Sequence, residues 1–102
     1  MTYFVVSVQM DEERGIGSYE EYIRRVKPIV ESYGGRYLVR SEKMQYLGNA
    51  WKPDRLIIIC FPSREKLDEC FQSEAYQEIA EKRSAWVDAQ AVIIEEEIYG
   101  DL

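Results

Sequence analysis

Arginine and tyrosine side chains in or beside apolar segments are the groups of this sequence best suited to small-molecule chemistry. The candidates are Tyr22, Tyr37, Arg40, Trp51, Arg55 and Arg83. Arginine carries a planar set of donors that suits a carboxylate or an enolate, and a tyrosine hydroxyl can donate to a carbonyl oxygen. Aromatic rings beside such donors could line a small pocket. These residue types favour a site for a small organic anion or an enolisable carbonyl compound, held by Arg40 or Arg55 beside Trp51.

The same residues also have a purely structural interpretation. The arginines could bind acidic side chains at helix ends or at a subunit interface, and Trp51 could be a packing anchor. Strand alternation argues against one shared pocket, because Tyr37 and Arg40 are expected on opposite faces of a strand. Tyr22, Tyr37 and Arg83 then remain as candidates for acid-base work. Both interpretations stay open on the sequence alone.

Metal and nucleophilic chemistry have few possible ligands or bases in this sequence. Histidine is absent, which removes the commonest metal ligand and the usual base of a nucleophilic triad. Cys60 and Cys70 have neither redox nor zinc-ligand spacing, and we expect both to be buried thiols. The acidic runs 11–13 and 95–97 are typical of solvated surface. We therefore predict that the protein needs no metal, haem or other cofactor.

The charge balance argues against nucleic acid and membrane partners. The chain has 13 basic and 19 acidic residues, a net charge of -6 and a pI near 4.7. A phosphate backbone would be repelled on average. The longest apolar run, Leu56–Phe61, is far shorter than the ~20 residues of a membrane span. No signal-peptide pattern precedes the strand-like residues that follow Met1, so we expect a cytoplasmic protein.

Hydrophobic periodicity predicts an α+β domain of βαββαβ order over residues 1–102. Predicted strands cover 3–10, Arg36 to Leu47, 55–61 and 91–94. The first helix is expected to begin with a capping box formed by Ser18 and Glu21, and to end at a left-handed stop at Gly34-Gly35. A second helical segment follows Pro62-Ser63, breaks near Ser73 and then resumes.

The third predicted strand indicates a partner. Its central residues, Leu56 to Ile59, have no polar alternation, so the strand must be covered on both faces. Two amphipathic helices on a four-stranded sheet can cover only one face. We therefore predict a homodimer in which a second copy covers the other.

Several short motifs together resemble a known family. They are Tyr22, Tyr33-Gly34-Gly35-Arg36-Tyr37-Leu38-Val39-Arg40, Trp51-Lys52-Pro53-Asp54-Arg55, Phe61-Pro62-Ser63 and Ser73-Glu74-Ala75-Tyr76. In order and spacing, the chain resembles the bacterial family called domain of unknown function 1330 (DUF1330), in the dimeric α/β-barrel superfamily. The resemblance implies a ferredoxin-like fold, in which a four-stranded antiparallel sheet carries two helices on one face and packs its other face against a partner's sheet.

The resemblance leaves the function open between two hypotheses. A carboxylate often stands in the family where this chain has Ser7 and Cys60, so any proton chemistry of those acids is lost here. The wider superfamily suggests a cofactor-independent enzyme, similar to a monooxygenase or an isomerase, acting on a small carbonyl, phenolic or anionic compound. The alternative is a non-catalytic dimeric module that binds a small ligand or has a structural role.

Overall fold

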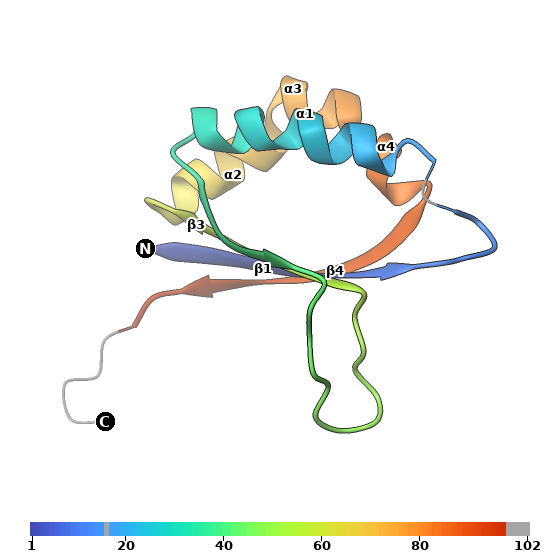
Figure 1. Ribbon diagram of the computed structural model, residues 1–102. Helices are drawn as coiled ribbons and strands as arrows, with labels where there is room; N and C mark the ends of the chain where they lie inside the picture. The colour runs from blue at the N-terminus through green and yellow to red at the C-terminus, as the bar shows by residue number, and fades with distance from the viewer. Residues whose placement is uncertain (16, 98–102) are drawn as a thin grey trace.

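The computed structural model describes residues 1–15 and 17–97; the rest of the predicted 1–102 domain, residues 16 and 98–102, lies outside the described part. Figure 1 shows the arrangement of the elements, with the helices above the sheet. In chain order they are β1 (Thr2–Met10), α1 (Tyr19–Ser32), β2 (Arg36–Ser41), β3 (Arg55–Phe61), α2 (Arg64–Gln72), α3 (Glu74–Ile79), α4 (Glu81–Ser84) and β4 (Val87–Glu95).

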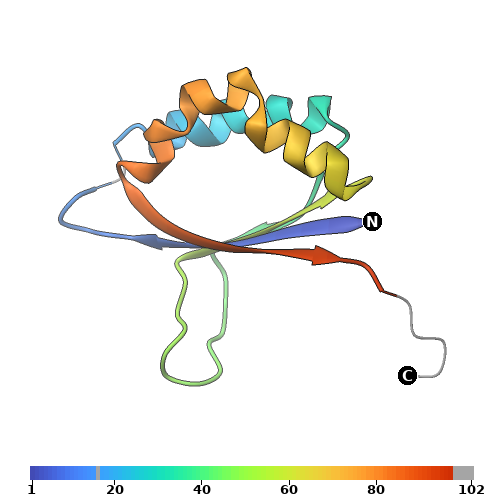
Figure 2. The same cartoon turned by 180° about the vertical axis from the view of Figure 1, so that it is seen from behind.

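The sheet has the order β2-β3-β1-β4, and all three strand pairs are antiparallel. All the helices lie on one face of this sheet, as Figures 1 and 2 show from opposite sides. This arrangement confirms the predicted ferredoxin-like α+β fold. No helix in the described part of the chain is long and apolar enough to cross a lipid bilayer.

The core lies between the sheet and the helices. Alternate residues of the central strands point into it, among them Val8 of β1 and both Ile59 and Phe61 of β3. Helix α1 contributes residues at helical spacing, including Val26 and Val30, which are buried. Cys60 and Cys70 are both buried free thiols, as expected from the sequence.

The ends of α1 agree only in part with the prediction. At its C-terminus, Gly34 has a positive φ of 84° and its N–H donates to the carbonyl of Glu31, while the N–H of Gly35 donates to Val30. This is the expected left-handed stop, with the two hydrogen bonds of a Schellman motif. The capping box at the N-terminus was a wrong prediction, because the side chain of Ser18 caps no N–H group of α1. Its hydroxyl instead donates to the carbonyl of Lys82 in α4.

The expected break in the second helical segment is confirmed at Ser73. Its side chain accepts from the N–H of Tyr76 and so begins α3, and its hydroxyl donates to the carbonyl of Cys70 at the end of α2. One serine therefore ends one helix and starts the next. The resulting change of direction lets α3 and α4 contact α1, and it brings Tyr76 toward that helix.

The second strand is shorter than predicted and the fourth is longer. β2 ends at Ser41, so residues 42–54 are a loop rather than the last part of a strand. Figure 1 shows this loop extending away from the sheet on the side opposite the helices. β4 runs from Val87 to Glu95, because pairing with β1 recruits flanking residues such as Asp88 and Ala89, which have low strand propensity.

The sheet face opposite the helices has no cover within the described chain. Val92 and Ile94 of β4 are 58% and 48% exposed. Trp51 and Leu47, in the loop that extends from this face, are 60% and 89% exposed. The open face therefore carries apolar surface, and its most exposed part lies on β4 and the loop, whereas Leu56 and Ile58 of β3 are half-buried.

Candidate functional site

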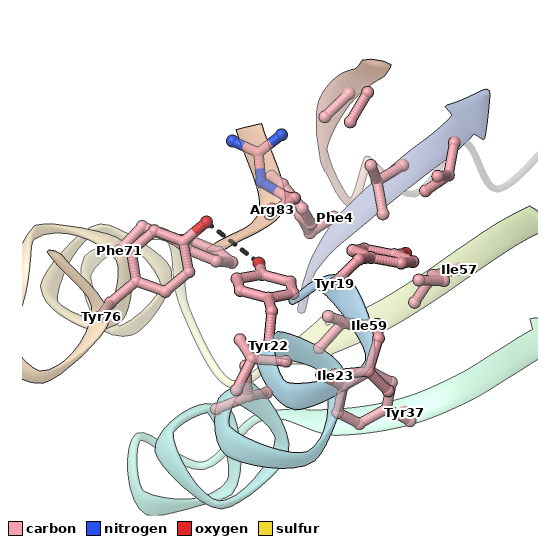
Figure 3. Close-up of a pocket in the computed structure, with 16 residues that line it drawn as sticks. Phe4, Tyr19, Tyr22, Ile23, Tyr37, Ile57, Ile59, Phe71, Tyr76 and Arg83 are labelled. Carbon is pink, nitrogen blue, oxygen red and sulfur yellow. Dashed lines mark hydrogen bonds between the residues drawn. The ribbon is translucent and has the colours of Figure 1, made fainter. Parts of the chain in front are cut away.

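A cavity of about 150 Å³ lies between the sheet and the helices. Figure 3 shows its side chains, which come from all four strands and from α1, α2, α3 and α4. Most of the lining is aliphatic or aromatic. The polar side chains are four tyrosines and one arginine, namely Tyr19, Tyr22, Tyr37, Tyr76 and Arg83.

Two of these tyrosines form a hydrogen-bonded pair in the wall of the cavity. The hydroxyl oxygens of Tyr22 on α1 and Tyr76 on α3 are 3.1 Å apart, and the dashed line in Figure 3 marks this contact. The two rings meet edge to face, with their centroids 6.2 Å apart. Phe71 packs against Tyr76 in the same manner, at 4.9 Å. These aromatic contacts fix the rings, so the hydroxyl pair has a defined position in the wall.

Three tyrosines of the cavity, Tyr19, Tyr22 and Tyr37, remain protonated at neutral pH. Burial raises the pKa of Tyr37 to about 12. Burial also raises the pKa of Tyr22 well above its ordinary value, and the hydrogen bond with Tyr76 adds to this effect. Burial raises the pKa of Tyr19 as well, although Arg55 and Arg83 act in the opposite direction. These hydroxyls can therefore donate hydrogen bonds to a ligand, but they are poor bases.

A β-bulge at Leu38 corrects the prediction that Tyr37 and Arg40 point to opposite faces. In the β2-β3 ladder, Tyr37 lies opposite Ile59 and Arg40 lies opposite Ile57, with a register shift between them. Residues directly opposite each other in an antiparallel pair share a face. Ile57 and Ile59 both line the cavity, so Tyr37 and Arg40 both lie on the helix side of the sheet.

Arg55 pairs with an acidic side chain, but this side chain lies in the loop after β2 and not at a helix end. Its guanidinium group forms an ion pair with Glu42, in which Nε lies 3.1 Å from the carboxylate oxygen Oε1. The guanidinium carbon also lies 5.6 Å from the centre of the Tyr19 ring, a cation-π contact. Arg55 therefore links the start of β3 to Tyr19 of α1 and to Glu42 at the start of the loop.

Trp51 lies apart from the other candidates. It lines a shallow groove with Val5 and Val92. Val5 alternates with Phe4 and Val6, which face the cavity, so this groove is on the opposite face of the sheet. The tertiary structure therefore brings Tyr22, Tyr37 and Arg83 together, leaves Arg40 and Arg55 beside them, and separates Trp51 from the set.

Tyr19 and Tyr76 line the cavity but were not among the candidates from the sequence. One signal was present in the sequence, because both tyrosines recur at helical spacing with apolar residues of their own segments. A buried tyrosine hydroxyl usually needs a hydrogen-bond partner. That the partner of Tyr76 is Tyr22, 54 residues away, follows only from the packing of α3 against α1.

The chemistry of this cavity is that of hydrogen-bond donors and positive charge. None of the described residues that line it carries a carboxylate or an imidazole. No group of three or more histidine, cysteine or acidic residues that could hold a metal ion occurs within 1–15 and 17–97. The site is thus suited to bind an oxygen atom with partial or full negative charge, and it offers no residue suited to remove a proton at neutral pH.

The fold and the cavity define a small ferredoxin-like domain with a pocket between its sheet and its helices. The model of the family "Domain of unknown function (DUF1330)" matches residues 1–97. The chain therefore belongs to the DUF1330 family, as the sequence motifs indicated. No curated protein matches the chain.

Solved structures with a similar fold come from proteins of several kinds. The RPA0582 protein of unknown function from Rhodopseudomonas palustris has a TM-score of 0.78 and 19% identity, over 96% of this chain and 83% of that one. SnoaB, a cofactor-independent oxygenase from Streptomyces nogalater, has a TM-score of 0.66 and 10% identity, over 99% and 97%. A putative antibiotic biosynthesis monooxygenase from Nitrosomonas europaea has a TM-score of 0.65 and 14% identity, over 94% and 98%. These likenesses show a shared fold.

Proposed function

We propose that the protein binds a small single-ring organic compound, phenolic or carbonyl in character, in the cavity between sheet and helices. The observation that carries this proposal is the pair of hydroxyls of Tyr22 and Tyr76 in an otherwise mostly apolar wall. A ligand oxygen could accept a hydrogen bond from this pair while the ring occupies the apolar part. Few polar groups in an apolar lining are typical of ligand sites.

The size of the cavity supports a ligand of one ring. Its volume is about 150 Å³. A dry apolar cavity of about 150 Å³ in another protein accommodates benzene. A compound with two fused rings would need the walls to move apart. Phenols, benzoquinone and cyclic ketones with one ring are therefore the classes to test first.

Thermal unfolding in the presence of such compounds tests the proposal. A ligand at one hundred times its dissociation constant adds about 2.7 kcal/mol of stability. We expect a clear rise in the melting temperature with phenol, and none with a fused-ring analogue. The variant Ala89→Phe fills the cavity and is expected to abolish the rise. Ala75→Phe makes the same change at an exposed position of α3 that does not line the cavity, and it is the matched control.

A second candidate function is a cofactor-independent oxygenation in the same cavity. It is favoured by the fold shared with SnoaB, whose own description is a cofactor-independent oxygenase. Because no described residue of the lining is a suitable base, the substrate would have to be acidic enough to ionise by itself. In the overall reaction a CH₂ group of the substrate becomes C=O, and O₂ supplies one oxygen atom to the product and one to water. The substrate carbon supplies the electrons.

Measurement of oxygen consumption distinguishes a cofactor-independent oxygenase from a non-catalytic ligand-binding module. A single-ring 1,3-diketone, which is enolisable and acidic, is the substrate to test with an oxygen electrode. Uptake of one O₂ per diketone in wild type, lost in Ala89→Phe, is the result expected of an oxygenase. Binding without oxygen uptake would leave the non-catalytic ligand-binding module, and loss of both signals would contradict the whole proposal.

The second copy of the chain is the proposed occupant of the open sheet face. This face is apolar in β3 and β4 and lies beside Trp51 of the extended loop. Exposed apolar surface is unfavourable in water, and the same surface of another copy could cover it. The dimer supports the ligand site indirectly, because the partner packs against the open face of the sheet and the other face forms the floor of the cavity.

A further inference from the structure

Three arginines from three different elements act on one tyrosine hydroxyl at the edge of the cavity. Arg55 of β3, Arg83 of α4 and Arg40 of β2 each lower the pKa of Tyr19 electrostatically, although burial dominates and raises it. The geometry agrees. Arg83 lines the cavity, and Arg55 lies 5.6 Å from the Tyr19 ring centre. Arg40 reaches the helix side of the sheet through the bulge at Leu38.

The positive charge of this group is only partly balanced. Glu42 neutralises Arg55. Within the described chain, Arg40 and Arg83 form no ion pair with any carboxylate. Arg83 is also half-buried. We call Arg40, Arg55 and Arg83 the cationic rim. It is a local positive region in a chain whose net charge is -6.

The cationic rim distinguishes between the neutral and the ionised forms of a ligand. A charge interaction is stronger where water is partly excluded, as it is at the half-buried Arg83. The protonated hydroxyls of Tyr19 and Tyr22 can donate to an anionic oxygen, and hydrogen bonds to an ionised acceptor are stronger than those to a neutral one. An anion would gain from both effects, whereas a neutral carbonyl would gain mainly from the hydroxyls.

We infer that the ligand is a single-ring aromatic acid or acidic phenol bound as its anion, with the charged oxygen toward Arg83 and Tyr22 and the ring among the apolar side chains. The inference rests on the proposed function of the cavity and adds the charge state and chemical class of the ligand. Arg83 and Arg40 select the anion. Arg55 positions the ring of Tyr19 and has its own charge matched by Glu42.

The test uses para-nitrophenol, whose phenolate is yellow and whose neutral phenol is colourless. Titration of this probe with pH, free and bound, measures the pKa of the phenol in the cavity. We expect the pKa to fall by about one unit or more, which means about tenfold tighter binding of the phenolate than of the phenol. In Arg83→Gln the fall is expected to disappear while the probe still binds. Arg40→Gln is expected to reduce this fall in pKa by less, because Arg40 is exposed.

Arg24→Gln is the matched control. Arg24 is exposed on α1, forms no ion pair among the described residues and does not line the cavity. The change Arg24→Gln removes the same charge from the chain as Arg83→Gln, so an effect of net charge alone would appear in this variant as well. If Arg24→Gln reduced the fall in the pKa of para-nitrophenol as much as Arg83→Gln does, the role of the cationic rim would be overturned.

A second pair of probes separates this inference from the proposed function. Benzoate and benzamide have nearly the same shape and differ in charge. Tighter binding of benzoate in wild type, reversed in Arg83→Gln, supports the selection of anions. Equal binding of the two compounds, with an unshifted pKa of para-nitrophenol, would overturn the inference and leave the ligand cavity intact. Binding of none of the three probes would overturn both.

Discussion

Removal of the hydroxyls of Tyr22 and Tyr76, singly and together, tests the geometry of the cavity wall. The two oxygens are 3.1 Å apart and partly buried. A hydrogen bond of this kind contributes about 1 kcal/mol net, and a half-buried hydroxyl left without its partner costs about 1–3 kcal/mol. Each change to phenylalanine keeps the edge-to-face ring contact at 6.2 Å, so packing is preserved.

We expect each single variant to lose about 1–2 kcal/mol of unfolding free energy, and the double variant to lose little more than one of them. Once the first hydroxyl is gone, the second has no partner left to lose. The coupling energy of the cycle is then about 1 kcal/mol, and each single variant melts roughly 4–8 °C lower per kcal/mol lost. Urea unfolding followed by circular dichroism at one fixed protein concentration measures these values, since a dimer makes stability depend on concentration.

Tyr46→Phe is the control for the cycle. The hydroxyl of Tyr46 donates to the carbonyl of Pro53 at 2.6 Å, inside the loop and outside the cavity. Its loss is expected to add to that of Tyr22→Phe without coupling. Additive costs for Tyr22→Phe and Tyr76→Phe would refute the argument, because they would mean that the two hydroxyls do not bind each other in solution.

Three further outcomes are expected. Gly35→Ala places a Cβ 2.4 Å from Cγ1 of Val30, so we expect a loss of about 1–3 kcal/mol in urea unfolding, and a stable variant would contradict the tight contact. Val92→Glu on the open face is expected to convert the dimer to a folded monomer in analytical ultracentrifugation, whereas Ala75→Glu on α3 leaves it unchanged; a monomeric wild type would rule the dimer out. Stability is expected to fall above about pH 10, because the folded protein holds the proton of Tyr37 up to a pKa of about 12 while the unfolded chain releases it near 10. Tyr37→Phe is expected to flatten this fall between pH 10 and 12, as measured by thermal melts, and an unchanged slope would contradict the raised pKa.

Local sequence patterns determined the order and type of the elements. The Gly34-Gly35 pair specifies a left-handed helix end, because glycine adopts positive φ without steric cost. Ser73 specifies the break between α2 and α3, because its side chain competes with the helix for backbone partners. The apolar run Leu56 to Ile59 specified a strand with two apolar faces. These are properties of single segments, so a single sequence is enough to read them.

The candidate site depended on the tertiary structure. The bulge at Leu38 arises where β2 and β3 pair, and it reverses the expected face of Arg40. Alternation along one strand cannot predict such a register shift, because the shift depends on which partner residues the strand meets. The predicted second strand continued to Leu47, but the chain leaves the sheet after Ser41.

The contact between Tyr22 and Tyr76 also depended on the tertiary structure. Helical spacing can place each residue on the apolar face of its own segment, but the distance between the hydroxyls depends on how α3 returns to α1 after the break at Ser73. Trp51 was assigned to the site by its aromatic type, and the loop carries it to the other face of the sheet. Periodicity specifies the face of a residue within its own element. Only the packing of the elements decides which side chains share a cavity.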